Sequence, residues 1–185
     1  GLRSGQKLGI MLRNLTLPVR TVDDFDDLPI PFRAVATDIA TGQKVVLDHG
    51  DLARALRASM AIPTAFSAVE IDGKLLVDGG VSDNVPVDVV REMGADVVIA
   101  IDIGTPLIAG AEVGRSYLTI LSQTLGFMTR ANMAPQLAAA DLVITPDVTK
   151  YGTLEFSAGQ KIIVKDEEEA RKLADQLRPF ALPEE

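Results

Sequence analysis

Hydrophobic positions near the start of the chain recur with the spacing of a helix. The pattern follows Ser4, a residue type that caps helices, and it ends before Pro18. Its apolar residues fall on one predicted helical face: Leu8, Met11, Leu12 and Leu15. The acidic, proline-containing stretch 23–31 then predicts a connector, in which the aspartates favour a solvated loop over a metal site.

The spacing next changes to that of strands. Apolar residues alternate through 32–39, Thr41-Gly42 predicts a turn, and 43–47 predicts a returning strand. Asp51 is placed to cap a helix that runs to about Met60. The residues expected on the inner face of that helix are Leu52, Ala55 and Leu56.

A hairpin is predicted after this helix. Two short strand-like runs, 69–71 and 74–77, are joined by Asp72-Gly73, a turn dipeptide that accepts positive φ at both positions. A helix is expected over 86–93, with proline in its first turn and Gly94 as its C-terminal cap.

The rest of the chain continues the alternation of strands and helices. Residues 96–102 form an apolar run bracketed by aspartates, which is typical of a strand buried on both faces in a parallel sheet. Three elements follow: a helical stretch over 114–140 with candidate breaks at Gly126 and Pro135, a strand over 142–145, and an amphipathic helix over 166–180 with an acidic first turn. We therefore expect an α/β layer fold.

Composition narrows the possible functions. The chain has 185 residues, 47% of them hydrophobic, which is enough for one compact domain with a core. Its formal charge of −8 argues against nucleic acid or an anionic membrane held by long-range attraction, so any lipid contact is expected to be local and largely apolar. The absence of cysteine excludes thiol catalysis and thiolate metal sites, and a single histidine excludes a histidine-rich metal site.

The most informative stretch for chemistry is Asp78-Gly79-Gly80, directly after the predicted strand 74–77. A strand end holds a carboxylate rigidly, and glycines let a neighbouring chain approach it closely. Alone, the same tripeptide is also an ordinary turn sequence.

Its surroundings favour the functional interpretation, because the run from Pro31 to Asp102 resembles patatin-like phospholipases. The matching motifs are Phe-Arg-Ala-Val-Ala-Thr-Asp over 32–38, Ala-Ser-Met-Ala-Ile-Pro over 58–63, Val-Asp-Gly-Gly over 77–80, Asn-Val-Pro-Val-Asp over 84–88 and Gly-Ala-Asp-Val-Val-Ile-Ala-Ile-Asp over 94–102. Residues 139–146 and 151–157 also look like the closing part of a bacterial patatin domain.

The resemblance implies a fold and an activity. The fold would be a three-layer α/β/α patatin-like fold with a mainly parallel central sheet, here incomplete. The activity would be hydrolysis of phospholipids or other acyl esters by a Ser-Asp dyad without a cofactor. Asp78 would be the catalytic aspartate, with Gly79 and Gly80 as the motif around it. A useful base at neutral pH would require a raised pKa for Asp78.

The nucleophile of such a dyad is not in the printed sequence. In the family it lies in a G-x-S-x-G elbow, and none of the serines here has that context: Ser4, Ser59, Ser67, Ser82, Ser116, Ser122 and Ser157. The glycine-rich oxyanion loop is absent too. We therefore expect residues 1–180 to be the C-terminal part of a patatin-like domain, with 181–185 beginning a linker, and the chain alone to be inactive.

Several other residues invite a functional interpretation that we weigh against a structural one. His49 is expected in an exposed turn, Ser59 at a helix end, and Asp83 and Asn84 as hydrogen-bonding partners in the loop around Asp78. Asp96 and Asp102 are expected to end a strand. The apolar side chains of 117–128 are expected in the core, with a membrane-contacting face as the alternative.

Two other classes of function remain to be compared with the hydrolase. The first is a non-catalytic fragment or a degenerate binding module. The second, a nucleotide-binding α/β domain, lacks both G-x-G-x-x-G and a P-loop lysine motif. A secreted protein and a cytoplasmic or membrane-peripheral one are both compatible with the sequence, and the oligomeric state is not predicted.

Overall fold

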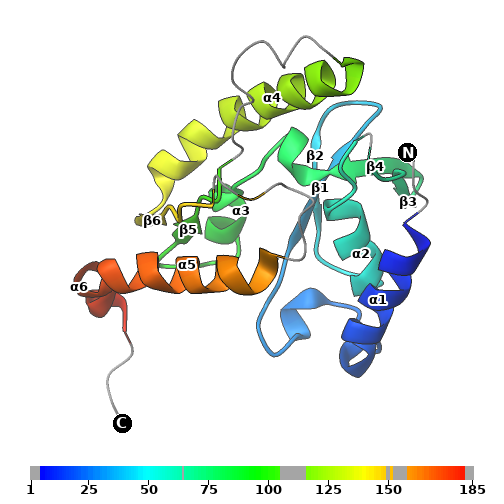
Figure 1. Ribbon diagram of the computed structural model, residues 1–185. Coiled ribbons are helices and arrows are strands. Elements are labelled where there is room, and N and C mark those ends of the chain that lie inside the picture. Colours follow the sequence, from blue (N-terminus) through cyan, green and yellow to red (C-terminus); the bar gives the residue numbers. More distant parts are fainter. Residues whose placement is uncertain (1–4, 64, 105–115, 149–150, 152–157, 182–185) are drawn as a thin grey trace. The chain divides into compact units, whose positions relative to one another are not determined.

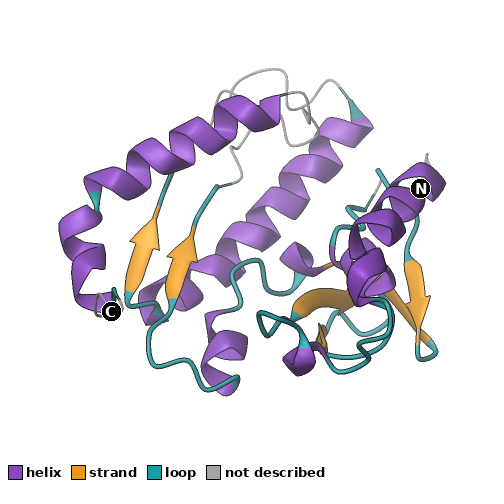
Figure 2. Ribbon diagram, turned by 90° about the horizontal axis from the view of Figure 1, so that it is seen from below, coloured by secondary structure: helices purple, strands orange, loops and turns teal. Residues whose placement is uncertain are grey.

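The computed structural model describes residues 5–63, 65–104, 116–148, 151 and 158–181. The chain divides into two compact units, Gly1–Asn84 and Val85–Glu185. Both contain helices and strands (Figures 1 and 2). The predicted α/β class is therefore confirmed.

The first unit is built on a sheet of four strands in the order β2-β1-β4-β3. The strands are β1 (Ala34–Asp38), β2 (Lys44–Leu47), β3 (Val69–Ile71) and β4 (Lys74–Asp78). All three neighbouring pairs are antiparallel. The hairpin prediction is confirmed, because Asp72 and Gly73 join β3 to β4 with φ values of 51° and 74°.

In its described residues, the first unit also contains two α-helices and three short 3₁₀ helices. Helix α2 (Leu52–Ser59) is capped as predicted by Asp51, whose carboxylate accepts a hydrogen bond from the Arg54 backbone N–H at 3.1 Å. It packs against β1 and β4, and α1 (Gln6–Thr16) packs against α2. The 3₁₀ helices are Leu17–Val19, Phe25–Asp27 and Gly79–Val81. The core lies between the sheet and α2, and it contains Phe25, Ala34, Ala36, Leu47, Ala55, Ala58 and Leu76.

The predicted inner face of α1 is only partly correct. Leu12 is buried, but Met11 and Leu15 are exposed, because in the first unit α1 packs chiefly against α2. The helix begins at Gln6 after Gly5, whose φ is 68°, and the Ser4 cap lies outside the described residues.

The second unit contains one parallel strand pair and several helices. Its elements within the described residues are α3 (Val87–Glu92), β5 (Ile99–Ile101), α4 (Tyr117–Ala139), β6 (Leu142–Ile144), α5 (Gly159–Lys172), α6 (Ala174–Leu177) and a 3₁₀ helix over Arg178–Phe180. Val87, Val98 and Ala100 form its small core. The cap at the end of α3 is as predicted, since Gly94 has a φ of 89°.

The expectation of a mainly parallel sheet is wrong for the described residues. Their larger sheet is antiparallel: short turns join β1 to β2 and β3 to β4, and β1 pairs with β4 across the helix α2 in sequence. The parallel pair among the described strands is β5 with β6. The expectation that the strand within 96–102 is buried on both faces is also wrong. Ala100 is buried, but Ile99 and Ile101 on the opposite face are 42% and 57% exposed.

Both long helices of the second unit differ from the prediction. Helix α4 continues through Gly126 and Pro135 without a break. Helix α5 begins at Gly159, so the acidic stretch 166–169 lies inside the helix instead of in its first turn. There its glutamates pair with cations three or four residues away: Lys165 with Glu168, Glu167 with Arg171 and Glu169 with Lys172. No helix within the described ranges has the length and hydropathy that a bilayer span requires.

Candidate functional site

Asp78 lies at the end of β4, one of the two inner strands of the first unit. Its Cα is paired with that of Ala36 on β1. On the other side its backbone N–H donates a hydrogen bond to the carbonyl of Ala61, at 3.1 Å. The backbone of Asp78 is therefore held both by β1 and by the segment that follows α2.

Two hydroxyl groups lie against the carbonyl of Asp78. Thr37, which is 1% exposed, donates its hydroxyl hydrogen to that carbonyl oxygen at 2.8 Å. The Ser82 hydroxyl oxygen lies 2.8 Å from the Thr37 hydroxyl. Because Thr37 has a single hydroxyl hydrogen, Ser82 is the donor in this second bond. The two side chains thus tie β1 to both ends of the Asp78 loop.

The two glycines after Asp78 are required by close contacts. A Cβ on Gly79 would lie 2.2 Å from the backbone oxygen of Val35, so a side chain there would collide with β1. A Cβ on Gly80 would lie 2.6 Å from Asn84 Oδ1 and 3.0 Å from Asp78 Oδ1. The predicted role of the glycine pair, close approach of neighbouring groups, is therefore seen at both positions.

The carboxylate of Asp78 caps the short 3₁₀ helix Gly79–Val81. Its Oδ1 accepts a hydrogen bond from the Gly80 backbone N–H at 2.8 Å. Burial raises the pKa of Asp78 above its ordinary value, and the bond from Gly80 opposes that rise in pKa. A partly desolvated carboxylate with a raised pKa has the property that a general base needs.

Asp83 supports the loop around Asp78. The Asp83 side chain is buried and forms an ion pair with Lys44 on β2, with 2.8 Å between Oδ2 and Nζ. Its backbone N–H donates a hydrogen bond to the Gly79 carbonyl at 2.8 Å. These bonds agree with the predicted loop-supporting role and also fix the loop to β2.

Other candidate residues are in the places that the structural interpretation predicts. His49 is exposed, and its Nδ1 lies 2.5 Å from the carboxylate of Asp48, which raises the pKa of His49. Ser59 ends α2. Asp102 follows β5, and its carboxylate accepts a hydrogen bond from the Gly104 backbone N–H at 2.8 Å. Asp96 lies before β5, where its carbonyl accepts a hydrogen bond from Arg91.

Side chains that could bind a metal do not gather in the described part of the chain, where no group of three His, Cys, Asp or Glu has suitable geometry. In the acidic stretch, Asp24 caps the 3₁₀ helix Phe25–Asp27, and Asp26 pairs with Arg33 at 2.7 Å.

The apolar stretch 117–128 is not the core segment that the sequence favours. Large side chains along this part of α4 are exposed: Tyr117, Ile120, Phe127 and Met128. Among the residues of this stretch whose burial the structure describes, the buried one is Gly126. Core packing is therefore wrong for these four side chains.

Arg57 is a structural residue of the site that the sequence did not reveal. It lies on the inner face of α2 and is only 8% exposed. Its guanidinium carbon lies 5.0 Å from the centre of the Phe66 ring, and its Nη2 donates to the Ser67 carbonyl at 3.2 Å. Burial lowers the pKa of Arg57. Arg57 thus anchors the end of the segment whose Ala61 carbonyl accepts the Asp78 N–H. The sequence contains one signal for this role, which is the position of this arginine among the alanines of a single helix.

Comparison with known proteins gives consistent matches. The sequence profile of the patatin-like phospholipase family matches residues 4–91. An uncharacterized NTE family protein of Mycobacterium tuberculosis is 37% identical over 114 residues, which are 62% of this chain and 29% of that protein. The mouse patatin-like phospholipase domain-containing protein 7 and human protein 6 of the same name are 45% and 43% identical over 82 residues, or 43% of this chain and 6% of each relative.

The chain matches less than a third of the length of each of these relatives. The residues that match the family profile, 4–91, include Asp78 and the glycines after it. The chain is therefore similar to the patatin-like phospholipase family over residues 4–91.

Proposed function

We propose that this chain supplies the aspartate of a Ser-Asp dyad in a lipid acyl hydrolase. The observation that carries the proposal is the carboxylate of Asp78, which is partly desolvated, has a raised pKa and is fixed at the end of an inner strand. The match of residues 4–91 to the patatin-like phospholipase family supports the lipid substrate class.

The position of the carboxylate oxygens suits a proton-accepting role. Oδ1 is occupied by the Gly80 N–H, whereas no hydrogen bond to Oδ2 is present among the described residues. Oδ2 would receive the proton of a serine hydroxyl while the serine oxygen attacks the ester carbonyl. The alkoxide that leaves would take this proton, and a water molecule would then hydrolyse the acyl-serine with Asp78 again as the base.

The serine itself must come from outside the printed residues, because the sequence contains no G-x-S-x-G. In this proposal the 185-residue chain alone hydrolyses no acyl ester. The same observation favours the second candidate, a non-catalytic patatin fragment or binding module. The two candidates differ in whether the full-length protein contains a reactive serine.

A fluorophosphonate probe separates the two candidates, because it reacts covalently with activated serines. We expect the full-length protein to be labelled and to release fatty acid from phospholipid vesicles, and the 185-residue chain to do neither. A full-length protein that is folded but neither labelled nor active would contradict the hydrolase and favour the binding module. Labelling of the 185-residue chain would contradict the proposal that the nucleophile lies elsewhere.

A further inference from the structure

Charge is unevenly distributed along the chain. The acidic residues begin at Asp23, and the first 22 residues contain no aspartate or glutamate. The cations in that segment are Arg3, Lys7, Arg13 and Arg20. Although the net charge of the chain is −8, its first 22 residues are basic and contain no acidic residue, and they include the whole of α1.

The same segment exposes large apolar side chains. Leu12 faces α2 and is 8% exposed, but the other side of α1 and the residue after it remain uncovered. The exposed fractions there are 53% for Ile10, 51% for Met11, 69% for Leu15 and 53% for Leu17.

The cations near these apolar side chains are not neutralised within the described part of the chain. Lys7, Arg13 and Arg20 take part in no ion pair there. Three cations of α5 differ in this respect, since Lys165, Arg171 and Lys172 each pair with a glutamate at 2.6 Å.

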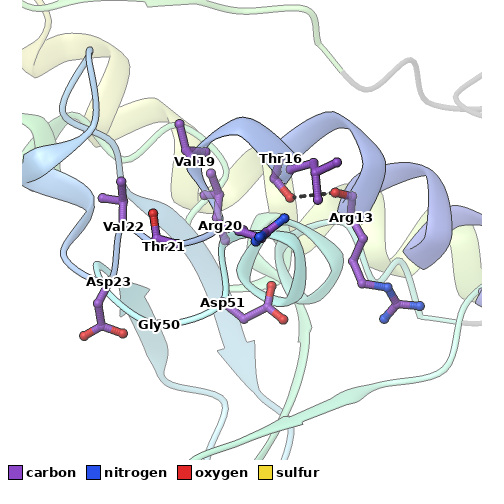
Figure 3. A pocket seen from close by; sticks show the side chains of 11 residues that line it. Arg13, Thr16, Val19, Arg20, Thr21, Val22, Asp23, Gly50 and Asp51 are labelled. Carbon is purple, nitrogen blue, oxygen red and sulfur yellow. Dashed lines mark hydrogen bonds between the residues drawn. The ribbon is translucent and has the colours of Figure 1, made fainter.

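A shallow groove of about 350 Å³ lies beside α1. Figure 3 shows Arg13 and Thr16 on the α1 side of this groove, and Asp23 and Asp51 on the side of the Gly50 loop. The two aspartates make the groove a poor site for a single phosphate. Arg13, Leu17 and Arg20 line the groove together with these aspartates. Helix α1 itself contains no acidic residue, and it exposes Lys7 beside Ile10 and Met11. The surface of α1 is therefore a better match to a negatively charged partner than the groove.

We propose that the surface around α1 docks on membranes that contain anionic phospholipids. This α1 surface consists of Lys7, Ile10, Met11, Arg13, Leu15, Leu17 and Arg20. Helices that lie in the membrane interface combine apolar side chains, which enter the boundary between headgroups and acyl chains, with basic side chains that attract anionic lipids. The acidic remainder of the protein opposes the approach only weakly, because charges more than about 8 Å apart are screened at physiological ionic strength.

The proposal goes beyond the proposed hydrolase and does not depend on it. Sedimentation with vesicles tests it directly, with phosphatidylcholine vesicles prepared with and without phosphatidylglycerol. We expect the chain to sediment with the phosphatidylglycerol vesicles, and added salt to weaken the binding. The triple variant Lys7→Gln/Arg13→Gln/Arg20→Gln should bind at least about tenfold more weakly, since each charge near an anionic surface changes binding about fivefold. Met11→Ser/Leu15→Ser should show a similar loss.

Two control variants match these changes in number and kind. Lys165→Gln/Arg171→Gln/Lys172→Gln removes the same charge from α5, and Phe127→Ser/Met128→Ser removes exposed apolar side chains from α4. Both controls should bind as the unchanged chain does, and circular dichroism verifies that every variant is folded. Equal binding by the α1 variants, or loss of binding in the α4 variant alone, would overturn the proposal.

Other possible partners of the α1 surface would give different results in these experiments. If a second copy covers it, light scattering will show a dimer that Met11→Ser/Leu15→Ser dissociates, without vesicle binding. If another part of the full-length protein covers it, the isolated chain will bind vesicles and the full-length protein will not. Either result would overturn the proposal. Vesicle binding by the full-length Asp78→Asn variant is expected to be unchanged, so a failure of docking is distinguishable from a failure of the catalytic assignment.

Discussion

The Thr37 hydroxyl donates a hydrogen bond to the backbone carbonyl of Asp78 at 2.8 Å, across 41 residues of sequence. It connects β1, one residue before its end, to the end of β4 at the residue that we propose as the catalytic base. With the Ser82 hydroxyl bonded to Thr37, the strand end and the loop after it form one hydrogen-bonded group. The rigidity of the Asp78 site therefore depends on buried neutral hydroxyls as well as on the sheet.

Thr37→Val tests this connection, because valine keeps the shape of threonine and removes the hydroxyl. It removes the hydroxyl that bonds to the Asp78 carbonyl and leaves the Ser82 hydroxyl with only its longer bond to the Gly79 carbonyl, at 3.4 Å. We therefore expect the free energy of unfolding to fall by about 1–3 kcal/mol. Urea unfolding of Thr37→Val, Ser82→Ala and the double variant measures the effect. The double variant should lose less than the sum of the single losses; full additivity would show that the hydroxyls act separately.

Gly79→Ala is expected to be strongly destabilising, because its Cβ would lie 2.2 Å from the Val35 backbone oxygen. Backbone movement is needed to relieve this collision, at a cost of about 2–4 kcal/mol. Gly9→Ala is the matched control: it lies within α1 with no atom near its added Cβ, and should stabilise by up to about 1 kcal/mol. Thermal unfolding compares the two variants, and equal melting temperatures would contradict the close approach of Gly79 to β1.

The raised pKa of Asp78 predicts a pH dependence of stability. A carboxylate whose pKa is higher in the folded than in the unfolded state binds its proton more tightly when folded, so its ionisation costs stability. As pH rises, this loss of stability begins near the pKa of the aspartate in the unfolded chain, about 3.9. The loss is complete once the pH is above the pKa of Asp78 in the folded state. Asp78→Asn keeps an oxygen acceptor for the Gly80 N–H and cannot ionise.

We therefore expect Asp78→Asn to be more stable than the unchanged chain at neutral pH, with the difference shrinking as pH falls toward about 4. Urea unfolding at a series of pH values measures the difference. A variant that is less stable at neutral pH would contradict the desolvation of this carboxylate.

Lys44→Met tests the ion pair that fixes the loop to β2. The Asp83 side chain is buried, so removing its cationic partner leaves a desolvated carboxylate and should cost about 2–3 kcal/mol. Lys165→Met is the control, because its pair with Glu168 is exposed and screened, and no measurable change is expected. If both variants unfold at the same urea concentration as the unchanged chain, the Lys44–Asp83 pair does not hold the loop.

Local features of the fold could be predicted from the sequence because they depend on neighbouring residues. Asp72-Gly73 sets the hairpin, Asp51 caps α2, and Gly94 ends the α3 region, each through its own backbone conformation or side chain. Asp78 could be located in the same way, at the junction of an apolar run and two glycines.

Features set by distant segments could not be predicted. The pairing of β1 with both β2 and β4 makes the larger sheet antiparallel, and no local pattern specifies which strands become neighbours. The collision that excludes a side chain at Gly79 comes from Val35, and the burial of Arg57 depends on Phe66. Exposure of Ile99 and Ile101 likewise depends on what covers β5, which an apolar run does not reveal.

The measurement that tests the catalytic assignment most directly is the rate of acyl-ester hydrolysis by the full-length protein and its Asp78→Asn variant. Asp72→Asn is the matched control, because Asp72 is exposed on the same hairpin with a φ of 51°, which asparagine adopts readily. We predict that kcat falls by at least about a thousandfold in Asp78→Asn, as when a base that activates a nucleophile is lost, and is unchanged in Asp72→Asn. A folded Asp78→Asn variant with undiminished kcat would contradict the role of Asp78 as the base of the dyad.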